Sequence, residues 1–350
     1  MRYSQAHIAV IGYALPDEIV RSVDLEARLE TLYSRLHLSP GQLEALTGIR
    51  ARRWWPAGFR ISEGALRAAV DAIKRAGIRP RDIDVLIHAG VCRDEFEPAT
   101  ACHVAAGIPG FNPRAMVYDV SNACLGVING IMQVANMIEL GQARCGLVVS
   151  CESARDITEN MIETLKNKGS MDYFRYGLAT LTGGSGAVAV LVTSSEFINT
   201  GRRRILGGVQ RAAPRHHMLC RWGLEPAGAG TSTVRQFMHT DSVNVLKYGV
   251  TLATETWNDF LQTLDWTPET IDRTICHQVG SAHQDTVLKT LGMPPEKDFV
   301  TYPELGNIGT VSLPITAAIA DEHGHLKPGQ TVGFLGIGSG LNCMMLGIEW

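Results

Sequence analysis

Cys124 is a candidate nucleophile, because it stands where an apolar run ends and a helical pattern begins. Residues 117–120 read as a buried strand, and apolar side chains in residues 125–138 recur near the helical period. Unpaired N–H groups and the positive end of a helix dipole at such a joint lower a thiol pKa and favour the thiolate. Buried structural cysteines are the more common kind, so the joint alone leaves both roles open.

An internal repeat brings other reactive residue types into register with this joint. The separation between Pro80 and Pro268 along the chain equals the separation between Gln142 and Gln330. One offset held over some sixty residues predicts two copies of one strand–helix unit.

The same offset aligns three further residues with the first half. It pairs Ser312 with Cys124, and it pairs Asn307, in a Gly-Asn-Ile-Gly turn, with Asp119. It also puts His277 at the end of a predicted strand. We therefore expect Cys124, His277 and Asn307 at matching strand ends, which converge on one pocket in a doubled α/β fold.

These three side chains suit acyl transfer. A cysteine can take an acyl group from a thioester, and imidazole and amide groups can stabilise an enolate or oxyanion. No metal or redox cofactor is needed. Papain-like hydrolases use the same residue types, but their Cys-Gly-Ser-Cys-Trp signature is absent and the strand–helix pattern differs. A non-enzymatic acyl-binding subunit is the remaining alternative.

The composition indicates a compact enzyme. The chain has 350 residues, 45% hydrophobic and 19% charged, and a net charge of -3, which argues against nucleic-acid binding. No apolar run is long enough to span a membrane, and the first residues do not resemble a signal peptide, so we expect a cytoplasmic protein. Eight cysteines without a Cys-x-x-Cys pair predict reduced thiols. His216, His217 and Cys220 lack a fourth ligand, so we expect no metal.

Strands alternate with helices throughout, which predicts a largely parallel sheet with helices on its faces. We place one half at residues 1–198 and the other at residues 199–350, with a junction near residues 194–204. A polar helical insertion spans residues 152–180. Its larger side chains line either an acyl channel or a dimer-facing cap: Met161, Leu165, Met171, Tyr173 and Phe174.

Four motifs resemble the thiolase superfamily, specifically the 3-oxoacyl-(acyl-carrier-protein) synthase III group. They are Asp-Val-Ser-Asn-Ala-Cys at residues 119–124, His-Gln at 277–278, Gly-Asn-Ile-Gly at 306–309 and Gly-Ile-Gly-Ser-Gly at 336–340. Within the group, the chain is most similar to head-to-head acyl-CoA condensing enzymes of long-chain olefin biosynthesis. The resemblance implies an acyltransferase with a five-layered α-β-α-β-α fold made of two duplicated halves. It also implies a homodimer with active sites near the interface, and Cys124, His277 and Asn307 as catalytic residues.

Glu97 distinguishes two reactions within this group. By the resemblance, it reaches the partner's Cys124 site. Joining two plain acyl thioesters requires removal of an α-proton, and a partly desolvated glutamate is a suitable base. The alternative is a decarboxylative synthase that uses a malonyl donor, in which Glu97 is a solvated residue of an acidic loop with Asp94 and Glu95.

The carrier is expected to be coenzyme A or an acyl-carrier protein, bound as part of the substrate. Arg50, Arg53 and Arg221 are candidates for phosphate contacts, and Gly338 and Gly340 for lining the acyl pocket. The chain departs from the group at residues 42 and 46, where Gln and Leu replace the Trp and Arg that clasp the adenine in many synthase III enzymes.

Overall fold

The computed structural model describes residues 1–197, 203–227 and 232–350. Within these ranges, nine strands form one sheet in the order β11-β12-β13-β8-β1-β7-β6-β4-β5. They are β1 (Ala6–Ala14), β4 (Val85–Ala89), β5 (Met116–Val120), β6 (Cys145–Glu152), β7 (Gly186–Ser194), β8 (Arg203–Ala212), β11 (Arg273–Cys276), β12 (Thr331–Gly338) and β13 (Asn342–Glu349). Two further pairs lie outside this sheet: β2 (Glu18–Arg21) with β3 (Ala51–Trp54), and β9 (Cys220–Pro226) with β10 (Val234–Thr240).

The large sheet is mixed, so the prediction of a largely parallel sheet is wrong. β4 runs parallel to β5 and β6, and β11 runs parallel to β12. β7 is antiparallel to β1 and β6, and β13 is antiparallel to β8 and β12. Residues 339–341 alone join β12 to β13, which is too short a connection for the crossover that a parallel pair requires.

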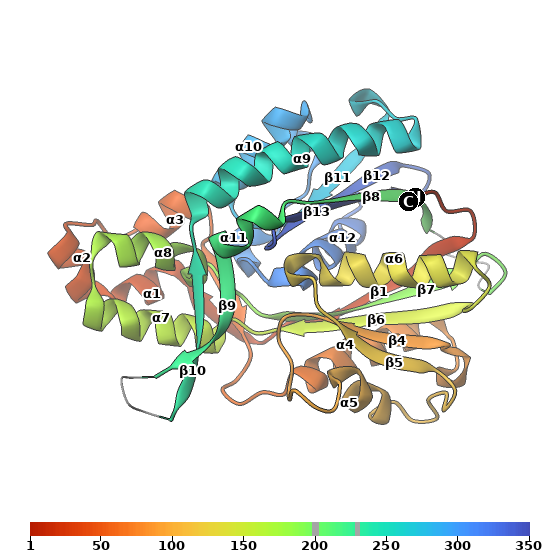
Figure 1. The fold of residues 1–350 in the computed structure, drawn as a ribbon, viewed down its shortest axis with the longest axis horizontal. Coiled ribbons are helices and arrows are strands. Elements are labelled where there is room, and N and C mark those ends of the chain that lie inside the picture. The colour runs from red at the N-terminus through yellow and green to blue at the C-terminus, as the bar shows by residue number, and fades with distance from the viewer. Residues whose placement is uncertain (198–202, 228–231) are drawn as a thin grey trace.

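Five layers result from the way the helices cover this sheet (Figure 1). α4 packs on β1, β6 and β7, with α5 beside it on β4 and β5. α6 and α12 lie in the middle, between the β1-β7-β6-β4 part of the sheet and the β8-β13-β12-β11 part. α9 covers β8 and β13 from the far side, with α10 against it. This α-β-α-β-α order is the predicted fold class.

The helices begin and end as follows. The α-helices are α1 (Ser22–Ala27), α2 (Glu30–Leu36), α3 (Gln42–Thr47), α4 (Ile61–Ala76), α5 (Thr100–Ala106), α6 (Gly126–Glu139), α7 (Arg155–Lys168), α8 (Met171–Leu181), α9 (Ser242–Leu264), α10 (Ser281–Leu291), α11 (Tyr302–Leu305) and α12 (Ser312–Glu322). The 3-10 turns are η1 (Pro80–Asp82), η2 (Ala123–Leu125), η3 (Pro214–Leu219), η4 (Pro268–Thr270), η5 (Pro295–Lys297) and η6 (Gly309–Val311). Among the described residues, none of these helices is long and apolar enough to cross a membrane.

The buried side chains explain why the helices pack in these layers. Alanines at residues 65, 68, 69 and 72 form the buried face of α4, so this helix can approach the sheet closely. Gly77 ends the helix in the left-handed conformation (φ 64°), as a glycine at this position predicts. α6 is apolar on most of its surface, as expected for a helix buried between two parts of a sheet.

The repeat is visible in the structure, with one shift in register. η1 followed by β4 recurs as η4 followed by β11 at the same offset that separates Pro80 from Pro268. However, η6 begins at Gly309, with a two-residue shift toward the N-terminus from the position that the start of η2 at Ala123 predicts. The structural counterpart of Cys124 is therefore Thr310 and not Ser312.

The two halves meet where β1 pairs with β8 at only two positions, His7 with Arg204 and Ile8 with Arg203. The predicted junction includes residues 198–202, which lie outside the described residues. The polar insertion forms α7 and α8, which pack against α1 and α2 in a separate apolar cluster.

Candidate active site

Cys124 lies in η2, directly before α6, as the sequence pattern predicts. The strand before it, β5, is at the edge of the sheet and is half-buried, so the prediction of a buried strand is wrong. Burial raises the pKa of the Cys124 thiol to about 12, with smaller contributions from the charges of Cys220 and Glu152. The expected low thiol pKa is therefore also wrong for the unliganded protein, because loss of hydration outweighs the helix dipole.

The two repeated turns, η2 and η6, pack against each other. Thr310 in η6 accepts a hydrogen bond from the N–H of Val127 (2.8 Å), in the first turn of the helix that follows Cys124. Gly338 lies on the other side, where a Cβ atom would stand 3.4 Å from the backbone nitrogen of Cys124. The absence of a side chain at Gly338 therefore leaves room beside the Cys124 N–H. Its place at an acyl pocket stays a prediction.

His277 follows β11 directly and is held by the main chain and by one side chain. Its N–H donates to the carbonyl of Leu335 (3.0 Å), and its Nδ1 atom lies 2.8 Å from the hydroxyl oxygen of Ser312. Burial lowers the pKa of His277 to about 3, so the ring is neutral near pH 7. Because Ser312 is the first residue of α12, directly after η6, this contact ties the imidazole to the turn that packs against Cys124.

Asn307 enters the same region from a turn. It follows α11 and a glycine, so the expectation that it ends a strand is wrong. Its amide oxygen accepts the N–H of Gly309 (3.1 Å), the first residue of η6. The NH₂ group of Asn307 is then the end of the amide that can donate to a substrate oxygen.

Glu97 lies in the exposed loop between β4 and α5. Its neighbour Phe96 is 83% exposed. In the single chain, Glu97 belongs to an outward-facing loop tip, whereas Cys124 is half-buried. That Glu97 acts at the site of a partner subunit stays a prediction.

The comparisons with known proteins identify the family. The chain is 51% identical to an acyl-CoA:acyl-CoA alkyltransferase of Shewanella oneidensis, and the match covers all of both chains. It is 35% identical to the Xanthomonas campestris protein of the same name, again over both whole chains. The chain belongs to the acyl-CoA:acyl-CoA alkyltransferase family.

Broader comparisons place this family among thiolase-superfamily acyltransferases. Residues 261–350 match the family described as 3-oxoacyl-(acyl-carrier-protein) synthase III C terminal. A beta-ketoacyl-(acyl-carrier-protein) synthase III of Symbiobacterium thermophilum is 30% identical over 100% of this chain and 99% of its own. The predicted resemblance is therefore confirmed.

Solved structures of Xanthomonas campestris OleA share the fold. One, with bound lauric acid and lauroyl-CoA, superposes with a TM-score of 0.92 at 35% identity, covering 99% of this chain and all of that one. Others carry replacements of a cysteine, a histidine or a glutamate.

The three arginines predicted to contact phosphates of the carrier make different contacts from one another in the structure. Arg50 is exposed and forms an ion pair with Glu304. Arg53 donates to the carbonyl of Pro16 (2.8 Å). Arg221 lies over the ring of Phe237. Their role in carrier binding therefore stays a prediction, as does that of Gly340, which is half-buried in the turn between β12 and β13.

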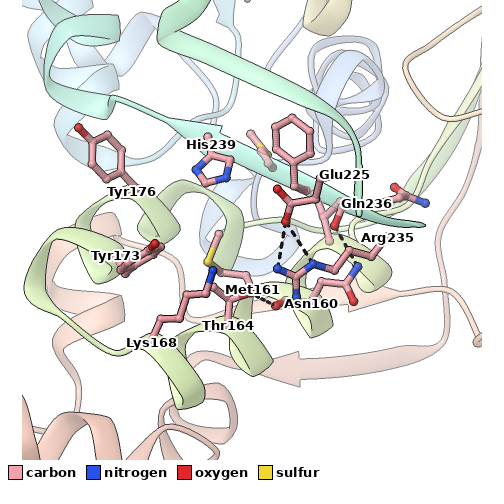
Figure 2. Close-up of a pocket in the computed structure, with 13 residues that line it drawn as sticks. Asn160, Met161, Thr164, Lys168, Tyr173, Tyr176, Glu225, Arg235, Gln236 and His239 are labelled. Carbon is pink, nitrogen blue, oxygen red and sulfur yellow. Dashed lines mark hydrogen bonds and ion pairs between the residues drawn. The ribbon is translucent and has the colours of Figure 1, made fainter. Parts of the chain in front are cut away.

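A pocket of about 160 Å³ lies between the insertion helices and the β9–β10 hairpin (Figure 2). Met161 and Tyr173 line it, whereas Leu165, Met171 and Phe174 belong to the apolar cluster under α7 and α8. Lys168 and the ion pair of Arg235 with Glu225 also border the pocket. Because the walls carry these charges, this pocket does not favour a hydrocarbon chain.

No group of three His, Cys, Asp or Glu side chains in the described residues is arranged to hold a metal ion. His216 stacks on Tyr248, and the ring of His217 bonds to the carbonyl of Pro214. All eight cysteines are free thiols.

The roles of two buried residues near the site were not predicted from the sequence. Ser312 was identified only as a repeat counterpart of Cys124, whereas it bonds to His277. Glu152 ends β6 with 3% of its surface exposed, and its charge acts on Cys124. The sequence did contain a signal for Glu152, because this carboxylate ends a strand that is otherwise mostly apolar. Burial of a charge costs free energy unless the charge is paired or hydrogen-bonded, so such a residue is expected to have a specific role.

Proposed function

We propose that this protein joins two fatty acyl-CoA molecules head to head in a non-decarboxylative Claisen condensation. The observation that carries the proposal is the convergence of Cys124, His277 and Asn307 around the packed turns η2 and η6. The name of its relatives, acyl-CoA:acyl-CoA alkyltransferase, supports the choice of substrates. The reaction belongs to lipid biosynthesis and takes place in the cytoplasm.

The first half-reaction acylates Cys124. The sulfur attacks the carbonyl carbon of the first acyl-CoA, the carbon–sulfur bond to coenzyme A breaks, and the thiol proton passes to the departing coenzyme A thiolate. Because burial raises the Cys124 pKa, the proton must be removed as the bond forms. The N–H of Cys124, left open beside Gly338, donates to the carbonyl oxygen as negative charge develops.

The second half-reaction forms the carbon–carbon bond. Glu97 removes an α-proton from the second acyl-CoA, and the enolate oxygen accepts hydrogen bonds from Nε2–H of His277 and the NH₂ group of Asn307. The α-carbon attacks the acyl-Cys124 carbonyl, and the Cys124 thiolate leaves and takes up the proton that Glu97 removed. The product is a β-ketoacyl-CoA. The proposed chemistry uses side chains and one main-chain N–H group of the protein, with coenzyme A as part of the substrate.

We further propose that the protein is a homodimer in which each Glu97 acts at the partner's Cys124. Glu97 and Phe96 are exposed on the single chain, at the tip of an otherwise anchored loop. The neighbouring edge strand β5 is half-buried and has one free edge, which suits a subunit contact. Within the dimer, Arg50, Arg53 and Arg221 are candidates for the phosphates of coenzyme A.

The test separates the two half-reactions. Wild type, Cys124→Ala and Glu97→Gln are each incubated with a long-chain acyl-CoA alone, and the intact mass of the protein and the small-molecule products are measured. We expect wild type to acylate and to release the β-keto product, Cys124→Ala to do neither, and Glu97→Gln to acylate without releasing product.

The second candidate reaction is decarboxylative condensation with a malonyl donor, favoured by the similarity to beta-ketoacyl-(acyl-carrier-protein) synthase III. It predicts that acylated wild-type protein releases product only after malonyl-carrier protein is added, and that Glu97→Gln is then as active as wild type. This outcome would overturn the non-decarboxylative proposal.

A further inference from the structure

The carboxylate of Glu152 connects the Cys124 site to the loop that carries Glu97. Glu152 is buried at the end of β6, and it accepts the N–H of Val91 (2.9 Å) at Oε1 and the N–H of Cys92 (3.2 Å) at Oε2. The next residue, Ser153, donates its N–H to the sulfur of Cys92 (3.4 Å). The thiol of Cys92 in turn donates to the carbonyl of Ser153 (3.6 Å). The start of the 90–99 loop is thus attached to the end of β6 by four hydrogen bonds.

Glu152 also contacts the turn on the other side. A Cβ atom at Gly309, in η6, would lie 3.2 Å from Cγ of Glu152, and one at Gly90 would lie 3.1 Å from Oε1. Both glycines therefore let the backbone close around this side chain. The carboxylate lies between the η6 turn of its own active site and the 90–99 loop.

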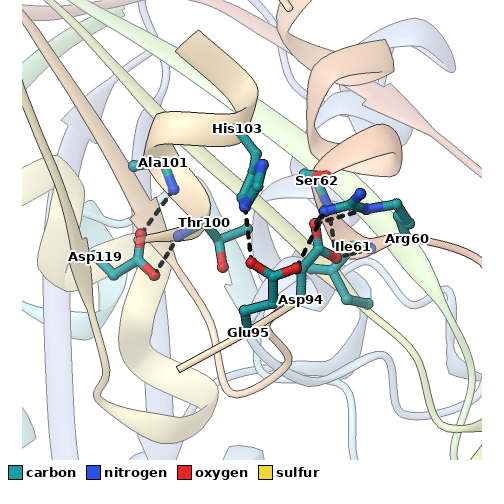
Figure 3. A network of polar contacts seen from close by, with 9 residues as sticks. All are labelled: Arg60, Ile61, Ser62, Asp94, Glu95, Thr100, Ala101, His103 and Asp119. Atoms are coloured by element: carbon teal, nitrogen blue, oxygen red, sulfur yellow. Dashed lines mark hydrogen bonds and ion pairs between the residues drawn. The ribbon is translucent and has the colours of Figure 1, made fainter. Parts of the chain in front are cut away.

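The rest of the 90–99 loop is anchored by other carboxylates (Figure 3). Asp94 accepts the N–H of Ile61 (2.6 Å) at the start of α4, and Glu95 lies 3.4 Å from the ring of His103. Asp119 accepts the N–H groups of residues 100 and 101, both at 2.8 Å, where α5 begins. Between these anchors, the exposed tip at residues 96–98 holds Glu97.

We propose that Glu152 is a positioning residue for condensation: it fixes the main chain of the 90–99 loop, and so places Glu97 for work at the partner's Cys124. The inference rests on the proposed function, in which Glu97 acts across a dimer. A carboxylate with both oxygens engaged by consecutive N–H groups fixes the direction of the chain at that point. Misplacement of a catalytic group by about 1 Å can cost about 100-fold in rate.

The first test is a comparison of rates. In Glu152→Gln, one N–H loses its acceptor, because the amide presents an NH₂ group in place of an oxygen. We expect Cys124 acylation by acyl-CoA within about threefold of wild type and a condensation rate reduced about 10–100-fold. The matched control is Glu139→Gln. Glu139 also accepts two consecutive N–H groups, of Ser4 and Gln5, but at the far end of α6, so both rates should be unchanged.

The second test locates the effect, using mixed dimers purified by two different tags. In the first dimer, one subunit carries Cys124→Ala and the other carries Glu152→Gln. Its only Cys124 thiol then faces a loop held by an intact Glu152, so condensation should proceed at half the wild-type rate. In the second dimer, both changes are in one subunit and the other is wild type. Its only Cys124 thiol faces the loosened loop, so condensation should fall about 10–100-fold.

The outcomes separate the inference from the proposed function. The same two dimers are made with Glu97→Ala in place of Glu152→Gln. If the Glu97 pair fails to show the trans pattern, the proposed function is wrong. If the Glu97 pair shows it while the Glu152 pair gives equal or reversed rates, Glu152 acts on its own Cys124 and the inference alone is overturned. Glu152→Asp, which keeps both oxygens on a shorter side chain, undergoes the same comparison if Glu152→Gln does not fold.

Discussion

The Nδ1 atom of His277 lies 2.8 Å from the hydroxyl oxygen of Ser312, and both side chains are buried. Burial keeps the imidazole neutral, so only one of its two nitrogens carries a hydrogen. If the Ser312 hydroxyl donates to Nδ1, the hydrogen is on Nε2, which is the donor that an enolate oxygen requires. The serine therefore sets which ring nitrogen carries the hydrogen that can stabilise negative charge.

Removal of this hydroxyl should slow condensation. In Ser312→Ala the ring loses the partner that fixes its tautomer and orientation, and we expect a decrease of about 10-fold in the condensation rate. The measurement is product release from long-chain acyl-CoA under single-turnover conditions. The control is a double-mutant cycle: Ser312→Ala added to His277→Ala should cause no further loss, and an additive loss would contradict the assignment.

Gly338 predicts a second effect, on acylation. A methyl group there would lie 3.1 Å from Leu125 and 3.4 Å from the nitrogen of Cys124, so it would cover the N–H that the thioester oxygen approaches. We expect Gly338→Ala to slow acylation of Cys124 by about 10–100-fold, as for loss of an oxyanion donor. Gly333→Ala, on the same strand, is the matched control, because its nearest neighbour would be 3.5 Å away in ordinary contact. Equal acylation rates for the two variants, measured by intact mass, would exclude this role.

The sequence alone predicted much of this site. The apolar run before Cys124, the glycine after α4 and the strand before His277 are local patterns, and each forms the predicted element. The Ser312 contact was not predictable, because the repeat keeps one constant offset elsewhere but is shifted at the η6 turn. Such a two-residue shift can be recognised only in the three-dimensional structure, where η2 and η6 pack against each other.

The Cys124 pKa illustrates a second limit. The helix that follows Cys124 is local and favours the thiolate. Its burial, which raises the pKa most, depends on the whole fold, and the charges of Cys220 and Glu152, which also raise the pKa, come from other parts of the chain. The partial exposure of β5 was not predictable for the same reason. Its apolar residues read as buried, but its place at the edge of the sheet depends on the order of all the strands.

Buried histidines should make the fold sensitive to acid. Burial lowers the pKa of His277 to about 3 and that of His88 to about 4, from an ordinary value of 6.5. Below pH 6.5 the unfolded chain binds protons that the folded chain does not, so the free energy of unfolding should fall as the pH drops from 6.5 to 4. Burial lowers the pKa of His283 to about 4 as well. Burial raises the pKa of Asp298 to about 6 and also raises that of Glu152; these two carboxyl groups act in the opposite direction, but against three histidines.

The measurement is urea unfolding at pH 7.0, 5.5 and 4.5, with NMR of the histidine ring protons over the same range. We expect a loss on the order of a few kcal/mol by pH 4.5. The ring signals of His88 and His277 should stay constant down to about pH 5. Titration of either ring near pH 6.5 would contradict the prediction.

Arg52 supports the turn that holds Asn307, and its loss should destabilise the fold. The guanidinium is fully buried, has no acidic partner in the part of the chain that the structure describes, and donates to the Ser22 hydroxyl (3.0 Å) and the Leu181 carbonyl (3.1 Å). Burial lowers its pKa to about 10. Leu181 precedes Thr182, whose carbonyl accepts the N–H of Asn307 (3.0 Å), so the guanidinium holds the segment to which the Asn307 turn is bonded.

Arg52→Ala should therefore lower the free energy of unfolding by about 3 kcal/mol, since it leaves a cavity and two buried groups without their donor. Arg50→Ala, two residues earlier, removes only an exposed ion pair with Glu304 and should change stability by less than about 1 kcal/mol. Urea unfolding of both variants measures the difference. If the two lose equal stability, Arg52 is not the buried support described here. If Arg52→Ala unfolds more easily and its folded fraction also condenses acyl-CoA slowly while Cys124 is acylated normally, the arginine supports both the fold and the placement of Asn307.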